Sequence, residues 1–392
     1  MKLRFLLPLA GGLLAAAATA PAVDVAAAMQ VAGQQLELAD KARTTTTRQP
    51  FTVNPDGSLK DREAAWWTSG FYPGSLWYTY EYSKKPLDRQ LAEKWTAALQ
   101  QEQYNKSTHD LGFMLYCSYG NGYRLTKNPA YRAVLVEGAR SLASRFDPKV
   151  GLLKSWDNHE GYKYPVIIDN MMNLEFLFWA SKATGDKQFY HIAVTHADNT
   201  LKHHFRPDYS SYHVVCYGPD GTVLRKKTAQ GYADSSAWAR GQAWGLYGYT
   251  VCYRETKNPA YLAQAEHIAD FYLNHPNLPA DKIPYWDFNA PDMPAAKRDA
   301  SAGAVAASAL LELSQYSKAS GPRYFKAAEQ MLQSLSSPTY RAAVGQNNNF
   351  VLRHSVGHLP AKAEVDVPLV YADYYYIEGL LRYDKRRVGK SI

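Results

Sequence analysis

The sequence has few cysteines and lacks the common metal, nucleotide and nucleophile motifs. Its three cysteines, Cys117, Cys216 and Cys252, are too few for a disulfide framework. Each lies in an apolar or aromatic stretch, which favours a buried free thiol. No H-E-x-x-H pattern or paired Cys/His spacing indicates a metal site. A Gly-x-Ser-x-Gly elbow, a P-loop and a Gly-x-Gly-x-x-Gly run before a helix are also missing, so serine hydrolases, NTPases and dinucleotide enzymes lack support.

Long apolar runs are confined to the N-terminus. The first residues read MKLRFLLPLAGGLLAAAATA, with Lys2 and Arg4 before an apolar stretch and the small residues Ala18 to Ala20 after it. This order is typical of a secretory signal peptide. No later run approaches the roughly 20 residues that a membrane span requires. We therefore expect a signal peptide over residues 1–20 and an exported, periplasmic protein that does not bind membranes.

The balance of charge is basic, with a net +8 that falls to +6 when Lys2 and Arg4 leave with the signal peptide. A basic exported protein favours acidic partners, including polyanionic sugars. The folded part has no basic run, so nucleic acid is not expected as a partner. Aromatic residues are abundant, with 30 Tyr, 9 Trp and 13 Phe, and they suit sugar rings as well as a large core.

A repeated turn organises the chain. TKNPAY occurs at Thr126–Tyr131 and again at Thr256–Tyr261, each time between two helical patterns. Looser versions lie around Leu87, Tyr190 and Tyr324. Asn and Pro form the turn, and Pro suits the first turn of the next helix. The spacing indicates one helical hairpin per repeat, with loops of variable length.

Six apolar segments with polar openings are expected to form inner helices, over residues 66–80, 109–123, 168–183, 239–254, 298–317 and 371–383. Each of the first five is followed by an amphipathic partner, and residues 23–42 supply the sixth partner from the N-terminus. Six hairpins predict an all-α fold, a closed (α/α)6 barrel over residues 21–385. An open solenoid is the alternative, but helices that are apolar on all sides need cover on every side.

Two smaller features complete the predicted architecture. Residues 210–231 have valine-rich flanks around a Pro-Asp-Gly turn, which predicts a small β-hairpin at the rim of the barrel. Residues 386–392 form a basic tail, as expected of a solvated terminus.

Asp110 and Asp169 stand at the openings of the second and third inner helices. If the inner helices run parallel, their N-terminal ends meet at one mouth, where two carboxylates could divide the roles of acid and base. The apolar residues Val166 to Ile168 precede Asp169, and burial there would raise its pKa toward proton donation. The alternative is that each aspartate caps its helix.

Other polar residues gather at the same openings. Arg240 lies in a tryptophan-flanked cluster that suits a carboxylate or sulfate, although a structural ion pair is the alternative. Arg298 and Asp299, beside Asp287, indicate a scaffold network instead. His109 and His213 are candidate ligand contacts, and an ordinary buried histidine is the alternative for each.

Several long motifs in order resemble one family. They are WWTSGFYPGSLW, STHDLGFM, IIDNMMNLE, SSYHVV, QGYADSSAWARGQAWGLYGY, PYWDFNAPDMPAAKRDASAGA and YADYYYIEGLL. Across nearly all of the mature chain they are similar to the unsaturated glucuronyl hydrolases, glycoside hydrolase family 88. The resemblance implies an (α/α)6 barrel without metal or cofactor. It also implies removal of the 4,5-unsaturated glucuronic acid that lyases leave on glycosaminoglycan oligosaccharides, by hydration of its vinyl ether double bond.

The resemblance also implies roles for individual residues. Asp169 would be the general acid and base, and Asp110 the second essential carboxylate. The positions that would line the pocket are His109, Trp67, Trp156, His213, Gln230, Arg240 and Trp244. The expected partners are oligosaccharides that end in an unsaturated uronic acid, with or without sulfate.

One stretch departs from the family. Where family members carry serines that touch the next sugar, this chain has Glu364 and Asp366. Acids there would repel a sulfate unless Lys362 or the residues Arg225, Lys226 and Lys227 offset them, so the sulfation preference stays open.

Two alternative functions remain. One is an unsaturated rhamnogalacturonyl hydrolase that acts on pectin fragments, although HDLGF and RGQAW favour the glucuronyl enzyme. The other is a non-catalytic sugar-binding toroid, which the aromatic content suggests and the two pocket aspartates oppose.

Overall fold

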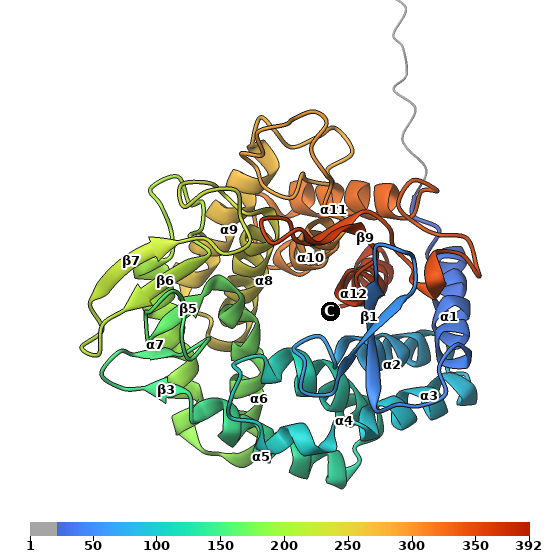
Figure 1. The fold of residues 1–392 in the computed structure, drawn as a ribbon, viewed down its shortest axis with the longest axis horizontal. Helices are drawn as coiled ribbons and strands as arrows, with labels where there is room; N and C mark the ends of the chain where they lie inside the picture. Colours follow the sequence, from blue (N-terminus) through green and yellow to red (C-terminus); the bar gives the residue numbers. More distant parts are fainter. Residues whose placement is uncertain (1–21) are drawn as a thin grey trace, which may run out of the picture.

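The computed structural model describes residues 22–392, a closed ring of helices in two layers (Figure 1). The predicted signal peptide lies outside the described residues. The inner layer is formed by α2 (Phe71–Ser83), η2 (Gly112–Gly120) continued by α4 (Asn121–Thr126), η3 (Ile168–Asn173) continued by α6 (Leu174–Thr184), α8 (Ala239–Thr256), α10 (Ala300–Leu313) and α12 (Val370–Arg387). Neighbours in this order pack on each other, and α12 packs on α2, so the ring closes.

The outer layer is formed by α1 (Val25–Lys41), α3 (Pro86–Ala97), α5 (Pro129–Ala143), α7 (Lys187–His203), α9 (Pro259–Asn274) and α11 (Gly321–Leu335). Helix α1 packs against α2, α3 and α12, which places the N-terminal helix in the last gap of the outer ring. The predicted (α/α)6 barrel is therefore confirmed, including its closure by the N-terminal helix.

The repeated turn works as its sequence indicates. Inner helices α4 and α8 are each followed by a left-handed lysine, Lys127 and Lys257, with φ of 58° and 59°. The next asparagine, Asn128 or Asn258, then accepts a hydrogen bond from the backbone N–H two residues later. Proline follows at the first helical position, where no donor is needed. One short sequence thus ends an inner helix and begins an outer one.

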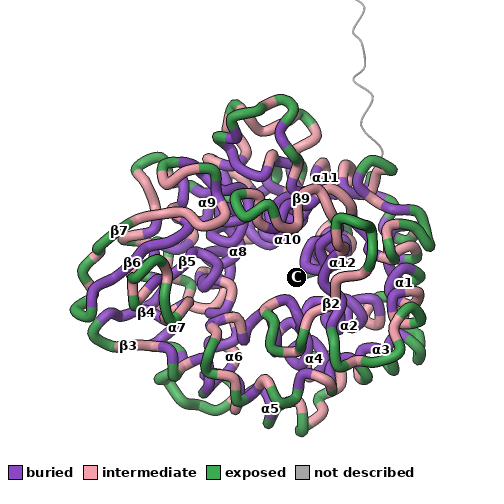
Figure 2. Tube along the Cα trace, in the orientation of Figure 1, coloured by how far each residue is buried: buried purple, intermediate pink, exposed green. Residues whose placement is uncertain are grey.

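The inner and outer helices differ in how far their residues are buried (Figure 2). Every residue of α10 is buried, whereas the outer helices bury only one face. One hydrophobic core runs from Val23 to Tyr383.

Helix α12 continues to Arg387, so it includes the first two residues of the predicted basic tail. All three cysteines are free and buried, as predicted.

The predicted rim hairpin is confirmed and belongs to a three-stranded sheet. Strands β6 (Val214–Tyr217) and β7 (Val223–Lys227) pair antiparallel, and β5 (Pro165–Ile167) pairs with the other edge of β6. Three further two-stranded sheets were not predicted, because most of their strands are short. They are β1 (Arg48–Val53) with β2 (Leu59–Glu63), β3 (Phe146–Asp147) with β4 (Leu152–Leu153), and β8 (Ser355–His358) with β9 (Ala363–Val367).

Two glycines allow the inner helices to approach closely at their N-terminal ends. A Cβ on Gly70 would lie 2.1 Å from the carbonyl oxygen of Phe113, and one on Gly112 would lie 2.5 Å from Oδ1 of Asn173. Only glycine fits such contacts without a shift of the backbone or of a neighbouring side chain. The polar openings of the second and third inner helices are thereby brought together.

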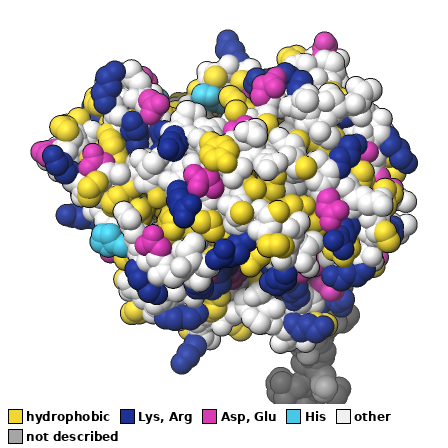
Figure 3. Space-filling model, turned by 90° about the horizontal axis from the view of Figure 1, so that it is seen from below, with side chains coloured by type: hydrophobic (Ala, Val, Ile, Leu, Met, Phe, Trp, Pro, Cys, Tyr) yellow, Lys and Arg dark blue, Asp and Glu magenta, His cyan; other side chains and the backbone are white. Residues whose placement is uncertain are grey.

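The outer surface has a mixed character. Basic and acidic side chains are interspersed on the face shown in Figure 3. Among residues 22–392, no helix is both long and apolar enough to cross a membrane.

Candidate active site

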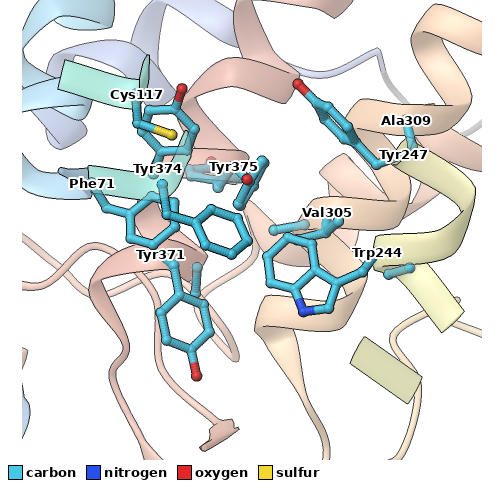
Figure 4. Packing of buried hydrophobic residues seen from close by; sticks show 14 of the residues in the cluster. Phe71, Cys117, Trp244, Tyr247, Val305, Ala309, Tyr371, Tyr374 and Tyr375 are labelled. Carbon is cyan, nitrogen blue, oxygen red and sulfur yellow. The ribbon is translucent and has the colours of Figure 1, made fainter. Parts of the chain in front are cut away.

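An aromatic layer divides the interior of the barrel into two ends. Phe71, Trp244, Tyr371 and Tyr375 are buried in this layer. Figure 4 shows the indole nitrogen of Trp244 and the hydroxyl of Tyr371 on one side, and the hydroxyl of Tyr247 on the other. The first side faces the N-terminal ends of the inner helices, where the predicted site residues lie.

A cavity of about 440 Å³ lies on the other side, at the C-terminal ends of the inner helices. All of its side-chain carboxylates have partners within the protein. The Glu378 carboxylate accepts hydrogen bonds from Tyr78, Tyr247 and Ser308, and it pairs with Arg382. Charges that are already paired stabilise the barrel but leave little for a substrate, so volume alone does not locate the active site.

Asp169 lies at the N-terminal end. Strand β5 leads into it, and the backbone N–H of Ile168 donates to the carbonyl of His213 at 3.0 Å. The side chain is buried and does not cap the helix. Burial raises its pKa to about 7, the nearby Asp110 adds to the rise, and the Arg240 charge opposes it. A carboxyl group with a pKa near neutrality can both donate and accept a proton.

His213 faces this carboxylate as a neutral donor. Its Nδ1 accepts hydrogen bonds from the backbone N–H groups of Ala229 and Gln230, both at 3.1 Å. The ring proton must therefore be on Nε2, which lies 3.7 Å from Oδ2 of Asp169. Burial lowers the pKa of His213 well below its usual value, so the ring stays neutral.

Asp110 has a second histidine beside it. Its Oδ1 lies 3.3 Å from Nε2 of His109, and its Oδ2 accepts a hydrogen bond from Thr108 at 2.8 Å. Neither Asp110 nor Asp169 makes a capping hydrogen bond to its helix, so the capping alternative is not supported. Because Asp110 helps to raise the pKa of Asp169, the two carboxylates act on one another across the same space.

Four buried polar atoms around this space have no partner within the protein: Oδ2 of Asp169, Nε2 of His213, Nε2 of His109 and Nε1 of Trp244. The Trp244 indole lies close enough to lower the pKa of Asp169, yet it makes no hydrogen bond of normal geometry. Buried polar groups are nearly always paired, so a cluster without partners indicates a place where a ligand binds.

Arg240 is more strongly tied to the scaffold than the sequence suggested. It is 1% exposed, and its guanidinium donates to Asp299 at 2.9 Å and to the carbonyls of Val356 and Gly357. The structural ion pair considered from sequence is therefore present, although the partner is Asp299. The Arg240 charge still lowers the pKa of Asp169, and its contact with substrate stays a prediction.

The three residues expected to form a scaffold network, Arg298, Asp299 and Asp287, each have structural partners. Arg298 pairs with Asp281, not with its neighbour Asp299. Asp287 accepts hydrogen bonds from the Tyr232 N–H and the Ser236 hydroxyl. Residues that adjoin in sequence therefore hold different loops in place.

Three predicted residues lie at the edges of the site. Trp67 is partly buried and packs against Tyr371 at 5.0 Å between ring centroids. Trp156 is partly buried and lies edge-on to His213 at 6.2 Å. The Gln230 side chain donates to the carbonyl of Gly357 at 2.9 Å, so it links the loop after β7 to β8. Their contacts with a sugar remain predictions.

The acids in β9 have partners other than those expected. Glu364 pairs with Lys60 at 2.6 Å, and Asp366 pairs with Lys297 at 2.9 Å and with His354 at 2.7 Å. The bases named from the sequence are not these partners: Arg225 lies 3.7 Å from Asp234, and Lys227 pairs with Glu160. How these charges affect a sulfated sugar stays a prediction.

Sequence reasoning missed two residues between the aspartates, Asn170 and Asn173. Both are fully buried, and their side chains connect the openings of η2 and η3. The signal was present in the run Asp-Asn-Met-Met-Asn, where two amides one turn apart interrupt an apolar segment. Over residues 22–392, no group of three or more His, Cys, Asp or Glu side chains is arranged to hold a metal ion.

Comparison with known proteins gives consistent matches. Glycosyl Hydrolase Family 88 matches residues 39–389. An unsaturated glucuronyl hydrolase from Formosa agariphila is 48% identical over 319 residues, which cover 81% of this chain and 79% of that protein. The unsaturated glucuronyl hydrolase of Bacillus sp. GL1 is 33% identical over 334 residues, covering 82% of this chain and 87% of that protein.

Solved structures agree with these matches. An unsaturated glucuronyl hydrolase described as specific for heparin has a TM-score of 0.91 and 50% identity, covering 93% of this chain and 98% of that one. A Streptococcus agalactiae enzyme variant in complex with dGlcA-GalNAc6S has a TM-score of 0.79 and 28% identity, covering 93% of this chain and 92% of that one.

Proposed function

This chain belongs to glycosyl hydrolase family 88, and from this we propose the reaction that it catalyses. It removes the 4,5-unsaturated glucuronic acid from the non-reducing end of oligosaccharides that lyases release from glycosaminoglycans. The observation that carries the proposal is Asp169, a buried carboxyl group with a pKa of about 7 beside buried polar atoms without partners.

The chemistry follows from that carboxyl group. Protonated Asp169 gives its proton to C4 of the vinyl ether, and the positive charge that develops at C5 is shared with the ring oxygen. Water then adds at C5 and returns a proton to the Asp169 carboxylate. The product is a hemiketal, which opens and releases the neighbouring sugar. The enzyme therefore begins and ends each cycle in the same protonation state.

Asp110 assists from the opening of the neighbouring helix, η2. Its negative charge helps to keep Asp169 protonated at the start, since like charges nearby raise the pKa of a carboxyl group. It also binds sugar hydroxyls. His109, His213 and Trp244 donate hydrogen bonds from the buried atoms that lack partners.

The remaining predicted residues bind the sugar at the edge of the site. Trp67 and Trp156 offer aromatic faces to the sugar rings. Gln230 and Arg240 hold the loops that border them. The substrate class is supported by the similar proteins, one described as specific for heparin and one in complex with dGlcA-GalNAc6S.

Loss of the ultraviolet absorbance of the double bond tests the reaction directly. Purified protein should remove this absorbance from lyase-generated unsaturated disaccharides, and Asp169→Asn should remove it at less than about a hundredth of that rate, since positioned proton transfer contributes about 10²- to 10⁴-fold. The exposed Asp292→Asn is the matched control and should be fully active. Full activity in Asp169→Asn would refute the assignment.

A substrate panel separates the alternatives. It contains unsaturated disaccharides of hyaluronan, chondroitin and heparin, sulfated and unsulfated, together with an unsaturated rhamnogalacturonan disaccharide. Turnover of the last alone would identify the pectin enzyme. Tight binding without any turnover would identify a sugar-binding protein.

We also propose that the chain is exported to the periplasm as one catalytic domain over residues 21–385. The support is the signal-like segment at residues 1–20. N-terminal sequencing of the mature protein from a periplasmic extract tests this, and an intact Met1 in the cytoplasmic fraction would contradict it.

A further inference from the structure

Two buried asparagines connect the two aspartates of the site. Asn170 and Asn173 lie one turn apart on η3, directly after Asp169, and both are 0% exposed. Buried amides must be hydrogen-bonded, and the direction of each bond decides which atoms can donate nearby. The direction of these hydrogen bonds can be assigned here, because each amide side chain contacts a backbone group that can only donate or only accept.

Asn173 has one possible orientation. The backbone N–H of Gly112 can only donate, and it lies 2.8 Å from the Asn173 side chain, so Oδ1 faces Gly112. The Nδ2 group therefore faces the other way, toward Oδ1 of Asn170 at 3.2 Å. The orientation of Asn170 is consistent with this. Its Nδ2 donates to the carbonyl of Leu153 at 2.8 Å, which can only accept, so its Oδ1 is the atom that faces Asn173.

The orientation of Asn173 fixes the state of His109. Nδ2 of Asn173 lies 3.4 Å from Nδ1 of His109, so Nδ1 faces a donor and must accept. The ring proton is then on Nε2, which lies 3.3 Å from Oδ1 of Asp110. Because burial lowers the pKa of His109, the ring is a neutral donor and not a cation.

The opposite tautomer is disfavoured by the groups that face the ring nitrogens. A proton on Nδ1 could be accepted by the second lone pair of the Asn170 oxygen, but it would stand against the Nδ2 donor of Asn173 at 3.4 Å. The Nε2 lone pair would then face the Asp110 carboxylate at 3.3 Å, and two acceptors repel at that distance.

We propose that Asn173 is a positioning residue for the reaction, which holds His109 as the neutral Nε2–H tautomer so that an N–H, and not a lone pair or a cation, faces Asp110 and the substrate space. Asn170 supports this arrangement by fixing Asn173. The consequence rests on the proposed function, because it matters only if Asp110 and Asp169 act on one substrate. A cationic His109 would instead cancel the Asp110 charge that helps to keep Asp169 protonated.

The tautomer can be observed without any substrate. In ¹⁵N spectra of histidine-labelled protein, the pair of ring signals that disappears in His109→Gln belongs to His109. Wild type should show a protonated Nε2 and an unprotonated Nδ1 at neutral pH. A protonated Nδ1 would overturn the inference, whether or not the protein turns over an unsaturated sugar.

Asn173→Asp removes the amide donor with almost no change in shape. The carboxylate can still accept from Gly112 but can no longer donate to His109 or to Asn170. We expect Nδ1 to become protonated and kcat to fall about 10- to 100-fold, the effect of losing a group that orients a site histidine. Asn121→Asp is the matched control, a buried asparagine beyond the aromatic layer that donates to Cys117 and Tyr374. It should leave the His109 signals unchanged.

A double-mutant cycle of Asn173→Asp and His109→Gln tests whether Asn173 acts through His109 or by a general disruption of the site. Glutamine at position 109 can offer an N–H near the position of Nε2 and carries no ring to orient. Asn173→Asp should therefore lower kcat much less in the His109→Gln background than in wild type. An equal fall in both backgrounds would show that Asn173 does not act through His109. If no variant or wild-type protein turns over any sugar, the proposed function fails, while the ¹⁵N result still decides the tautomer.

Discussion

Replacement of Asp169 by asparagine should make the protein more stable as well as inactive. The carboxyl group is buried, and its pKa is raised from 3.8 to about 7. The folded state therefore holds a proton that the unfolded chain loses as the pH rises above 3.8, so stability falls as the pH rises from there to about 7. Asparagine carries no charge and removes this dependence.

The size of the effect follows from the pKa. A rise of about 3 units corresponds to about 4 kcal/mol of lost stability once the group is fully ionised, near about pH 8. Near about pH 5 the native group is still protonated, and the loss is only about 2 kcal/mol. The free energy of unfolding of Asp169→Asn should therefore exceed that of wild type by about twice as much near about pH 8 as near about pH 5.

Urea denaturation of both proteins at the two pH values measures this difference. Asp292→Asn, at an exposed site, should change stability little and equally at both pH values. A gain in Asp169→Asn that is independent of pH, or a loss of stability near about pH 8, would refute the argument that burial keeps this carboxyl group protonated.

Three other predictions concern the same end of the barrel. In wild type, kcat/KM should fall about tenfold per pH unit above about 7, because the reaction needs protonated Asp169; a rate that is flat up to about pH 9 would contradict this. Trp244→Phe keeps a ring in the aromatic layer but removes the indole donor that lowers the pKa of Asp169, so the fall in kcat/KM should begin at higher pH. Gly112→Ala would place a Cβ 2.5 Å from Oδ1 of Asn173, and thermal melts should show a loss of about 1–3 kcal/mol. Its control lies away from the site: Gly33→Ala, in the outer helix α1 with no atom within 4 Å, should instead gain about 0.5–1 kcal/mol.

The fold could be predicted because its determinants are local and repeated. Asn128 and Asn258 cap their helices through side chains beside them in sequence, and proline follows each. Apolar faces then decide which helices are inner and which are outer. The paired short strands were missed because a strand of two to six residues carries too little alternation to stand out.

The sequence predicted which residues gather at the site but not which of them pair with one another. The apolar flank of Asp169 indicated burial, and the structure bears this out with a raised pKa. The partner of Arg240 could not be found, because Asp299 is 59 residues away and meets it only when the barrel closes. The same holds for Lys60 and Glu364, which are 304 residues apart.

The sequence by itself determined the number of hairpins, their order and the polar residues at their openings, because periodicity and turn chemistry act between near neighbours. The tertiary structure alone decided which of those polar atoms are paired and which are left for a substrate. Asn173 and His109 are 64 residues apart, and the hydrogen bond between their side chains exists only because Gly112 lets two helices touch. Protonation and tautomer depend on such contacts, since burial and the direction of each donor set them.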